Sequence, residues 1–125
     1  MDVASAFLDP EMGATTFDVS RLTFTRSSGS DPAEEKFLGV MGSIHPGTPE
    51  MIDLLPEEER HETFIYIHTE FAISLGKDSG DKYTVPDRIS WNNQVWKAVR
   101  IRDWSSFGFY EVLAVQMQEG DYASA

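Results

Sequence analysis

Clusters of turn-forming residues interrupt this chain at fairly regular intervals, and this punctuation constrains the fold more than any other feature of the sequence. Gly, Pro, Asn, Asp and Ser gather near residues 9–13, 26–32, 45–49, 76–86 and 92–93. The segments between these clusters are short and rich in Val, Ile, Phe, Tyr, Trp and Thr, which favour β-strands. We therefore expect strands at residues 16–26, 36–44, 62–71, 87–91, 94–101 and 109–117.

The first of these segments changes phase along its length. Its apolar positions are Phe17 and Val19, and then Leu22 and Phe24. Because side chains alternate between the two faces of a strand, this change of phase predicts a β-bulge or a bend near residues 20–21.

Two connections have recognisable chemistry. Asn92 and Asn93 tolerate the positive φ angles of a tight hairpin turn, and they separate two predicted strands. Residues 49–60 are the only convincing helical segment, with Pro49 in the first turn and Pro56 as an interruption. We expect one short helix there, with a second turn beginning at Pro56.

Six strands with one short helical insertion predict a mainly β fold, a small six-stranded antiparallel β-barrel or sandwich. The length of 125 residues suits a single domain. We expect an N-terminal arm over about residues 1–15, the barrel over about 16–117 and a polar C-terminal tail over 118–125.

Composition argues against several classes of function. The chain carries 21 Asp and Glu against 10 Lys and Arg, a net charge of -11 at pH 7. Such a surplus argues against tight wrapping of nucleic acid and against docking on an anionic membrane. Cysteine is absent, which excludes thiolate nucleophiles and thiolate metal sites. No apolar run approaches the roughly 20 residues that span a bilayer, so we expect no membrane partner.

No motif in the sequence indicates catalysis, a cofactor or a metal. His61 and His68 are seven residues apart, and residues seven apart on a strand point to opposite faces. His45 adds no metal-binding spacing to either of them. The serines lack a G-x-S-x-G elbow, and GKDSGDK at residues 76–82 lacks the spacing of a phosphate-binding loop. We interpret that segment as a flexible loop or a contact arm.

Charges are segregated along the chain. The acidic segment with its terminal arginine comprises Glu50, Asp53, Glu57, Glu58, Glu59 and Arg60. The basic hairpin comprises Arg88, Lys97, Arg100 and Arg102. Two interpretations stay open: the segments could join copies head to tail into a ring, or they could be ordinary scatter of charge over a solvated surface.

Aromatic residues are concentrated in the last third of the chain. The members that we single out are Trp91, Trp96, Trp104 and Tyr110. A small barrel needs large side chains to fill its core, and Trp and Tyr are also frequent in the energetic centres of interfaces. Both interpretations, barrel core and contact face, remain possible.

The order of these features resembles the small head–tail connector proteins of tailed bacteriophages, the head-closure (stopper) or neck group. The resemblance covers roughly residues 36–115. Its motifs are GSIHPGTP (42–49), LPEEER (55–60), PDRISW (86–91) with VWKAV (95–99), and DW (103–104) followed by GFYE (108–111). They concern spacing and turn chemistry and include no catalytic signature.

The resemblance implies a non-enzymatic virion protein that forms a ring between capsid portal and tail and lines the DNA channel. It implies six or twelve copies that contact one another, portal or adaptor proteins and tail proteins, with DNA passing through transiently. It implies assembly in the host cytoplasm and a final location in the virion neck. Residues 44–60 would form an inter-subunit or lumen-facing loop, and Trp91, Trp96 and Tyr110 would pack the barrel.

Three other hypotheses remain. A tail-terminator-like ring is the nearest to the first. An acidic mimic of DNA would share the negative charge, although the basic segment between residues 88 and 102 disagrees with it. A small-ligand-binding barrel would need aromatic residues that line an open cavity.

Overall fold

The computed structural model describes residues 14–29, 31–60 and 63–118, and the structural statements below refer to these residues. The strands are β1 (Ala14–Thr25), β2 (Ala33–Pro46), β3 (Phe64–Thr69), β4 (Lys77–Ser79), β5 (Lys82–Thr84), β6 (Arg88–Trp91), β7 (Gln94–Trp104) and β8 (Phe109–Gln116). Short 3-10 helices are η2 (Pro49–Leu54), η3 (Glu57–Glu59) and η4 (Ser105–Phe107). Nearly all of the predicted N-terminal arm (1–15) and C-terminal tail (118–125) lies outside the described residues.

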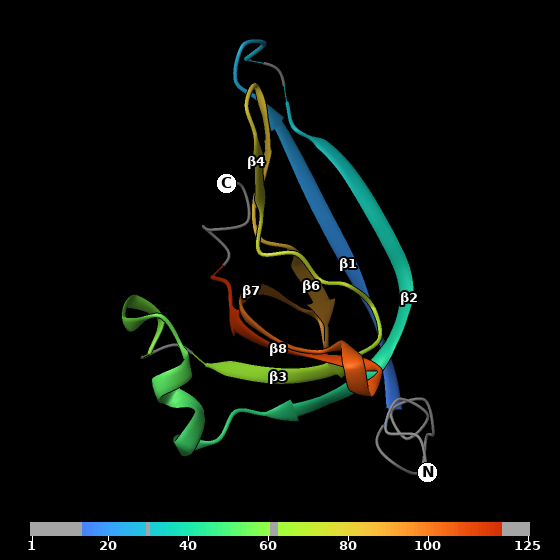
Figure 1. Ribbon diagram of the computed structural model, residues 1–125, viewed down its shortest axis with the longest axis vertical. Coiled ribbons are helices and arrows are strands. Elements are labelled where there is room, and N and C mark those ends of the chain that lie inside the picture. The colour runs from blue at the N-terminus through green and yellow to red at the C-terminus, as the bar shows by residue number, and fades with distance from the viewer. Residues whose placement is uncertain (1–13, 30, 61–62, 119–125) are drawn as a thin grey trace.

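Six strands close into an antiparallel barrel, which confirms the predicted fold class. Their order is β2-β3-β8-β7-β6-β1, and pairing between β1 and β2 completes the circle (Figure 1). Asn92 and Asn93, with φ angles of 56° and 60°, form the predicted tight turn between β6 and β7. Closure pairs most strand edges, which would otherwise be open to other chains.

A projection that we call the finger extends from the barrel (Figure 1). It consists of the outer part of the β1–β2 hairpin (residues 21–29 and 31–37) and the β4–β5 hairpin (77–84), which pairs with the end of β1. The interpretation of residues 76–82 as a flexible loop was therefore wrong. Thr23 to Thr25 pair with Lys82 to Thr84, so backbone hydrogen bonds order this segment.

The predicted bulge at residues 20–21 was also wrong. β1 keeps a regular register there, and the extra residue lies in β2 opposite Asp18, where Gly39 adopts a φ of +66°. The Gly39 backbone N–H donates to Asp18 Oδ1 at 3.0 Å. The apolar pattern of β1 changes phase for another reason: Arg21 continues the alternation of Phe17 and Val19 with a charged side chain.

The interior of the barrel is filled with side chains. Its buried apolar members are Phe17, Val19, Ile65, Ile67, Ile73, Ile89, Trp96, Ala98, Val112 and Ala114. A second apolar cluster lies on the outer face of β3 and β8, where Leu55 covers Leu113 and Val115. The barrel is thus packed on the inside and covered on one outer face.

The expected helical insertion is present as two 3-10 turns. Pro49 lies at the start of η2, and Pro56 separates η2 from η3, as predicted. Neither turn is long enough to bury a helical face of its own, so tertiary contacts hold them in place.

A buried ion pair joins the finger to the barrel. The Asp87 side chain is fully buried, and Arg21, 25% exposed, donates from Nε to Oδ1 at 3.0 Å and from Nη2 to Oδ2 at 2.8 Å. Arg21 Nη2 also donates to the Ala72 carbonyl, and the Ser74 backbone N–H donates to Asp87 Oδ2. The hydrogen bond to Asp87 raises the pKa of Arg21 above its ordinary value, against the opposing effect of burial.

Candidate functional site

The acidic insertion (residues 49–60) is docked on the barrel. Leu55 is 2% exposed in the outer apolar cluster, and the Arg60 Nε–H donates to its carbonyl oxygen at 3.3 Å. Glu59 Oε1 accepts a hydrogen bond from Lys97 Nζ on β7 at 2.8 Å. These contacts fix the position of the insertion relative to the barrel.

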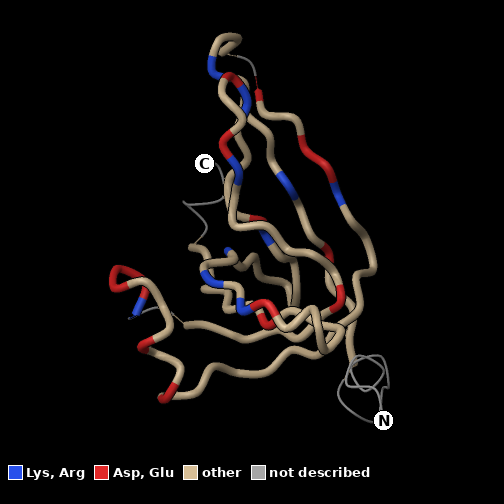
Figure 2. Tube along the Cα trace, in the orientation of Figure 1, with Lys and Arg blue, Asp and Glu red and all other residues tan. Residues whose placement is uncertain are grey.

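The other acidic side chains of the insertion face solvent. Glu50, Asp53, Glu57 and Glu58 are exposed, as is Arg60. Figure 2 shows the acidic residues of the insertion as red segments beside the barrel, away from the finger. The insertion therefore presents a negative surface while one carboxylate anchors it.

The predicted basic hairpin is largely neutralised within the chain. A bulge between Ala98 and Arg100 places Lys97, Arg100 and Arg102 on the outer face of the barrel. Lys97 pairs with Glu59, and Arg102 Nε lies 3.1 Å from Glu111 Oε1. Arg88 is half-buried on β6, whereas Arg100 is exposed. The acidic and basic segments that the sequence suggested as contacts between copies thus meet in a single chain at Lys97.

The aromatic residues divide between core and surface. Trp96 is 3% exposed in the barrel core, and its Nε1–H donates to the Trp91 carbonyl oxygen at 3.2 Å. Trp91 and Tyr110 are partly buried and pack against the same core. Trp104 is 37% exposed and lies with Phe107 at the η4 turn. The core interpretation is confirmed for Trp96, and Trp104 is a surface residue.

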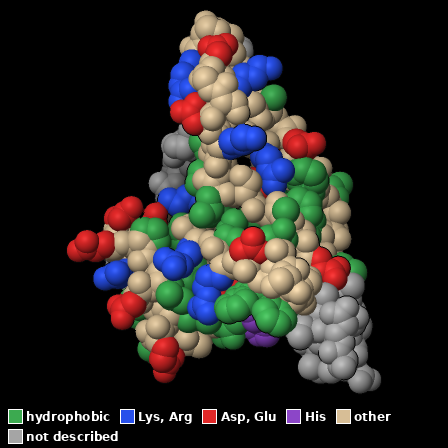
Figure 3. Space-filling view, viewed as in Figure 1, with side chains coloured by type: hydrophobic (Ala, Val, Ile, Leu, Met, Phe, Trp, Pro, Cys, Tyr) green, Lys and Arg blue, Asp and Glu red, His purple; other side chains and the backbone are tan. Residues whose placement is uncertain are grey.

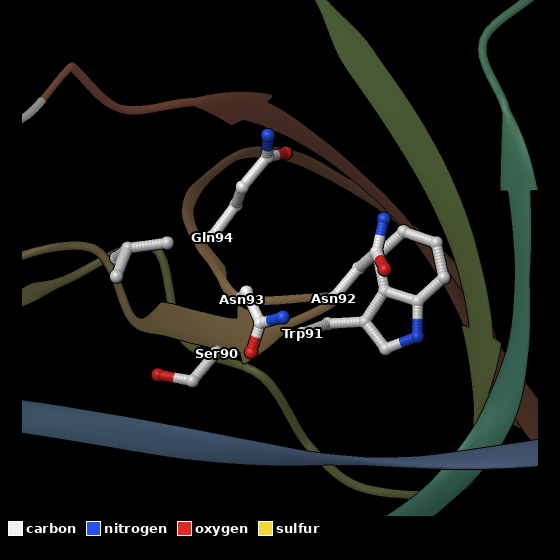
Figure 4. Close-up of a pocket in the computed structure, with 6 residues that line it drawn as sticks. Ser90, Trp91, Asn92, Asn93 and Gln94 are labelled. Atoms are coloured by element: carbon white, nitrogen blue, oxygen red, sulfur yellow. The ribbon is translucent and has the colours of Figure 1, made fainter.

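A hollow of about 360 Å³ lies beside the β6–β7 turn. Figure 4 shows that Ser90, Trp91 and Gln94 point in different directions around it. Ligand sites usually place a few polar groups so that they converge on one point, which these side chains do not do.

Sequence reasoning missed a cluster on the outer faces of β2, β3 and β8. The register pairs His45 with Tyr66 and His68 with Glu111, and it brings the two histidine rings to 5.6 Å between centroids. His68 Nε2 lies 2.8 Å from Glu111 Oε2, and His45 Nε2 lies 3.0 Å from Ser43 Oγ.

Strand register, not spacing along one strand, creates this cluster. The sequence analysis considered the spacing between His68 and His61, and His61 lies outside the described residues. His45 and His68 meet because β2 and β3 are neighbours. In the described part of the chain, no group of three or more His, Asp or Glu side chains is arranged to hold a metal ion.

Lowering the pH is expected to reduce the free energy of unfolding of the wild-type protein by more than it reduces that of a His45→Gln variant. Burial, and secondarily the charge of His68, lower the pKa of His45 below its ordinary value of 6.5. The unfolded chain therefore takes up a proton near pH 6.5 that the folded chain still excludes, so stability falls as the pH drops through this value. Urea unfolding at about pH 7.5 and about pH 5.5 measures the effect. An equal loss in both proteins would contradict this prediction.

Comparison with known proteins gives one informative similarity. The chain is similar to an uncharacterized protein of Xylella fastidiosa (strain 9a5c). They are 32% identical over 76 residues, which are 61% of this chain and 52% of that protein. The chain thus spans about half the length of the relative that it matches. No protein-family model matches the chain. Within the described residues, no helix has the length and apolar character needed to cross a membrane.

Proposed function

We propose that this chain is a ring-forming structural subunit of the neck of a tailed bacteriophage, located between the capsid portal and the tail and surrounding the DNA channel. The motifs that carry the resemblance to neck proteins fall on the kinds of element that the resemblance leads us to expect, a strand end, a loop and a hairpin. GSIHPGTP includes the end of β2 and leads into the acidic insertion, and PDRISW with VWKAV forms the β6–β7 hairpin. A closed barrel with one docked loop provides a rigid unit for a ring.

The unpaired outer edge of β2 is the observation that carries the proposal. A closed barrel needs no free edge, yet β2 extends beyond its pairing with β3, and residues 33–41 have no strand partner on their outer side in the described chain. Leu38 on this edge is 73% exposed, and Met41 is 41% exposed. An extended edge with exposed apolar side chains is a surface for association with another chain.

The remaining features favour a structural protein over a ligand carrier. Large side chains fill the interior of the barrel, and the hollow beside Trp91 has no polar side chains that converge on one point. Glu50, Asp53, Glu57 and Glu58 are exposed together on the insertion, and a negative channel wall would let DNA slide without holding it. The proposal therefore assigns the surplus charge to passage of DNA and not to its binding.

Self-association is the property that tests the proposal. We expect the protein to form rings, alone at high concentration or on purified portal from the same phage, as measured by light scattering and electron microscopy. Leu38→Glu should weaken association at least about tenfold while leaving the melting temperature nearly unchanged, because the side chain touches little within its own chain.

Ser106→Glu, an equally acidic change at an exposed position of η4, serves as the control and should assemble as the wild type does. A protein that stays monomeric at all concentrations and does not bind the portal would refute the proposed function.

A further inference from the structure

The finger carries a hollow of about 350 Å³ between β1 and the β4–β5 hairpin. Lys77, Ser79, Lys82 and Thr84 share one face of the hairpin, because Lys77 pairs with Thr84 and Ser79 with Lys82. Thr23 of β1 continues this face opposite Thr84. Arg21, Ser74 and Tyr83 complete the lining of the hollow, in which Arg21 is already paired with Asp87 and the two lysines are the other basic side chains.

The two lysine side chains are exposed, and neither makes an ion pair within the residues that the structure describes. Acidic side chains near the hairpin are engaged elsewhere. Arg26 binds Asp78 on the opposite face through two hydrogen bonds of 3.0 and 3.1 Å, which lower the pKa of Asp78. Asp81 accepts hydrogen bonds from Ser27. The face with the hollow therefore keeps its positive charge, and Figure 3 shows basic side chains gathered on the finger.

The acidic insertion offers the complementary charge in a fixed position. Glu57 and Glu58 are exposed on the η3 turn, while Leu55 and the Glu59–Lys97 contact hold the insertion against the barrel. The insertion lies beside the barrel and the finger projects from a different part of it, so the two segments lie apart in one chain (Figures 1 and 2). They can meet only between copies.

We propose that the hollow of the finger receives the acidic insertion of the next copy, with the carboxylates of Glu57 and Glu58 bound by the ammonium groups of Lys77 and Lys82. The hydroxyl groups of Thr23, Ser79 and Thr84 lie where they can donate further hydrogen bonds to those carboxylates. This inference rests on the proposed ring function and supplies its head-to-tail contact. Such a contact uses two different surfaces, as closed rings require. In this contact, the basic partner of the acidic insertion lies on the finger, and not on the hairpin at residues 88–102 that the sequence suggested.

Charge-reversed proteins test the proposal by complementation. Glu57→Lys/Glu58→Lys alone, and Lys77→Glu/Lys82→Glu alone, should each associate at least about tenfold more weakly than the wild type, because like charges then meet at every contact. An equimolar mixture of the two proteins should regain assembly, since each insertion then finds an opposite charge in the other protein. The combined four-residue variant should assemble by itself.

The matched control is Glu50→Lys/Asp53→Lys, which changes the same net charge within the insertion but outside the proposed contact. It should assemble normally, and all variants should keep the wild-type melting temperature. Rings that form normally in either reversed protein would overturn this contact while leaving the proposed function intact. Absence of assembly in the wild type would instead reject the proposed function.

Duplex DNA is the competing occupant of a lysine-lined hollow. Fluorescence anisotropy with a short duplex at low salt separates the two cases. Loss of DNA binding in Lys77→Glu/Lys82→Glu, together with unchanged assembly, would assign the hollow to phosphate groups and overturn the proposal. We expect DNA binding to be weak and sensitive to salt. It should prevent neither ring formation by the wild type nor the recovery of assembly in the mixture of charge-reversed proteins.

Discussion

Arg21→Met is expected to lower the free energy of unfolding by about 3–5 kcal/mol. The variant leaves the Asp87 carboxylate fully buried, with the Ser74 backbone N–H as its remaining donor. An uncompensated buried charge costs far more than the net contribution of the pair that it belonged to. The guanidinium carbon of Arg21 also lies 5.1 Å from the centroid of the Phe37 ring, so the expected loss includes this cation–π contact besides the uncompensated charge.

The double variant Arg21→Met/Asp87→Asn separates the charge from the packing. Replacing both members removes the buried carboxylate, and we expect it to recover at least about 1 kcal/mol relative to Arg21→Met. Urea unfolding monitored by tryptophan fluorescence gives these values. A double variant less stable than Arg21→Met would show that the aspartate stabilises the fold without its partner.

Trp96→Ala is expected to cost about 3–5 kcal/mol of stability. The indole is 3% exposed, lies in the barrel core and packs against Trp91 with 6.1 Å between ring centroids. Its removal leaves a cavity and takes away the donor to the Trp91 carbonyl oxygen. Thermal unfolding followed by circular dichroism measures the loss.

Trp104→Ala is the matched control, because the same chemical change occurs at a side chain that is 37% exposed. It should cost less than about 1 kcal/mol. Equal destabilisation by the two substitutions would contradict the division of the tryptophans into core and surface.

The barrel was predictable because its signals are local. Short β-rich segments, a tight Asn92–Asn93 turn and a break at Pro56 each report on neighbouring residues, and each appears in the structure. The number and spacing of those segments predicted a barrel or a sandwich, and the pairing between β1 and β2 shows that the barrel is the correct alternative.

The errors arose where distant contacts decide the outcome. Residues 76–82 look like a loop, yet pairing with the end of β1 orders them as strands. Arg21 broke the apolar alternation of β1 because its partner, Asp87, is 66 residues away. The bulge lies at Gly39 in β2, because glycine can adopt a positive φ at little cost, and not in the middle of β1.

The candidate site was harder to predict because charge patterns along a chain do not show which groups pair. Lys97 and Glu59 are 38 residues apart in sequence and in contact in the fold. Two lysines that make no ion pair in the described residues, Lys77 and Lys82, lie together on the finger, in a segment that the sequence suggested only as a loop or contact arm.

The way in which β1 is shared between barrel and finger has a mechanical consequence. This strand runs from Ala14 to Thr25 without interruption, and β2 on one side and β6 and β5 on the other hold it along most of its length. β1 therefore contains no loop that could act as a hinge between the barrel and the finger. A force on the tip would be transmitted along β1 to Phe17 and Val19 in the core, so the finger is a stiff extension of the barrel and not a flexible tether.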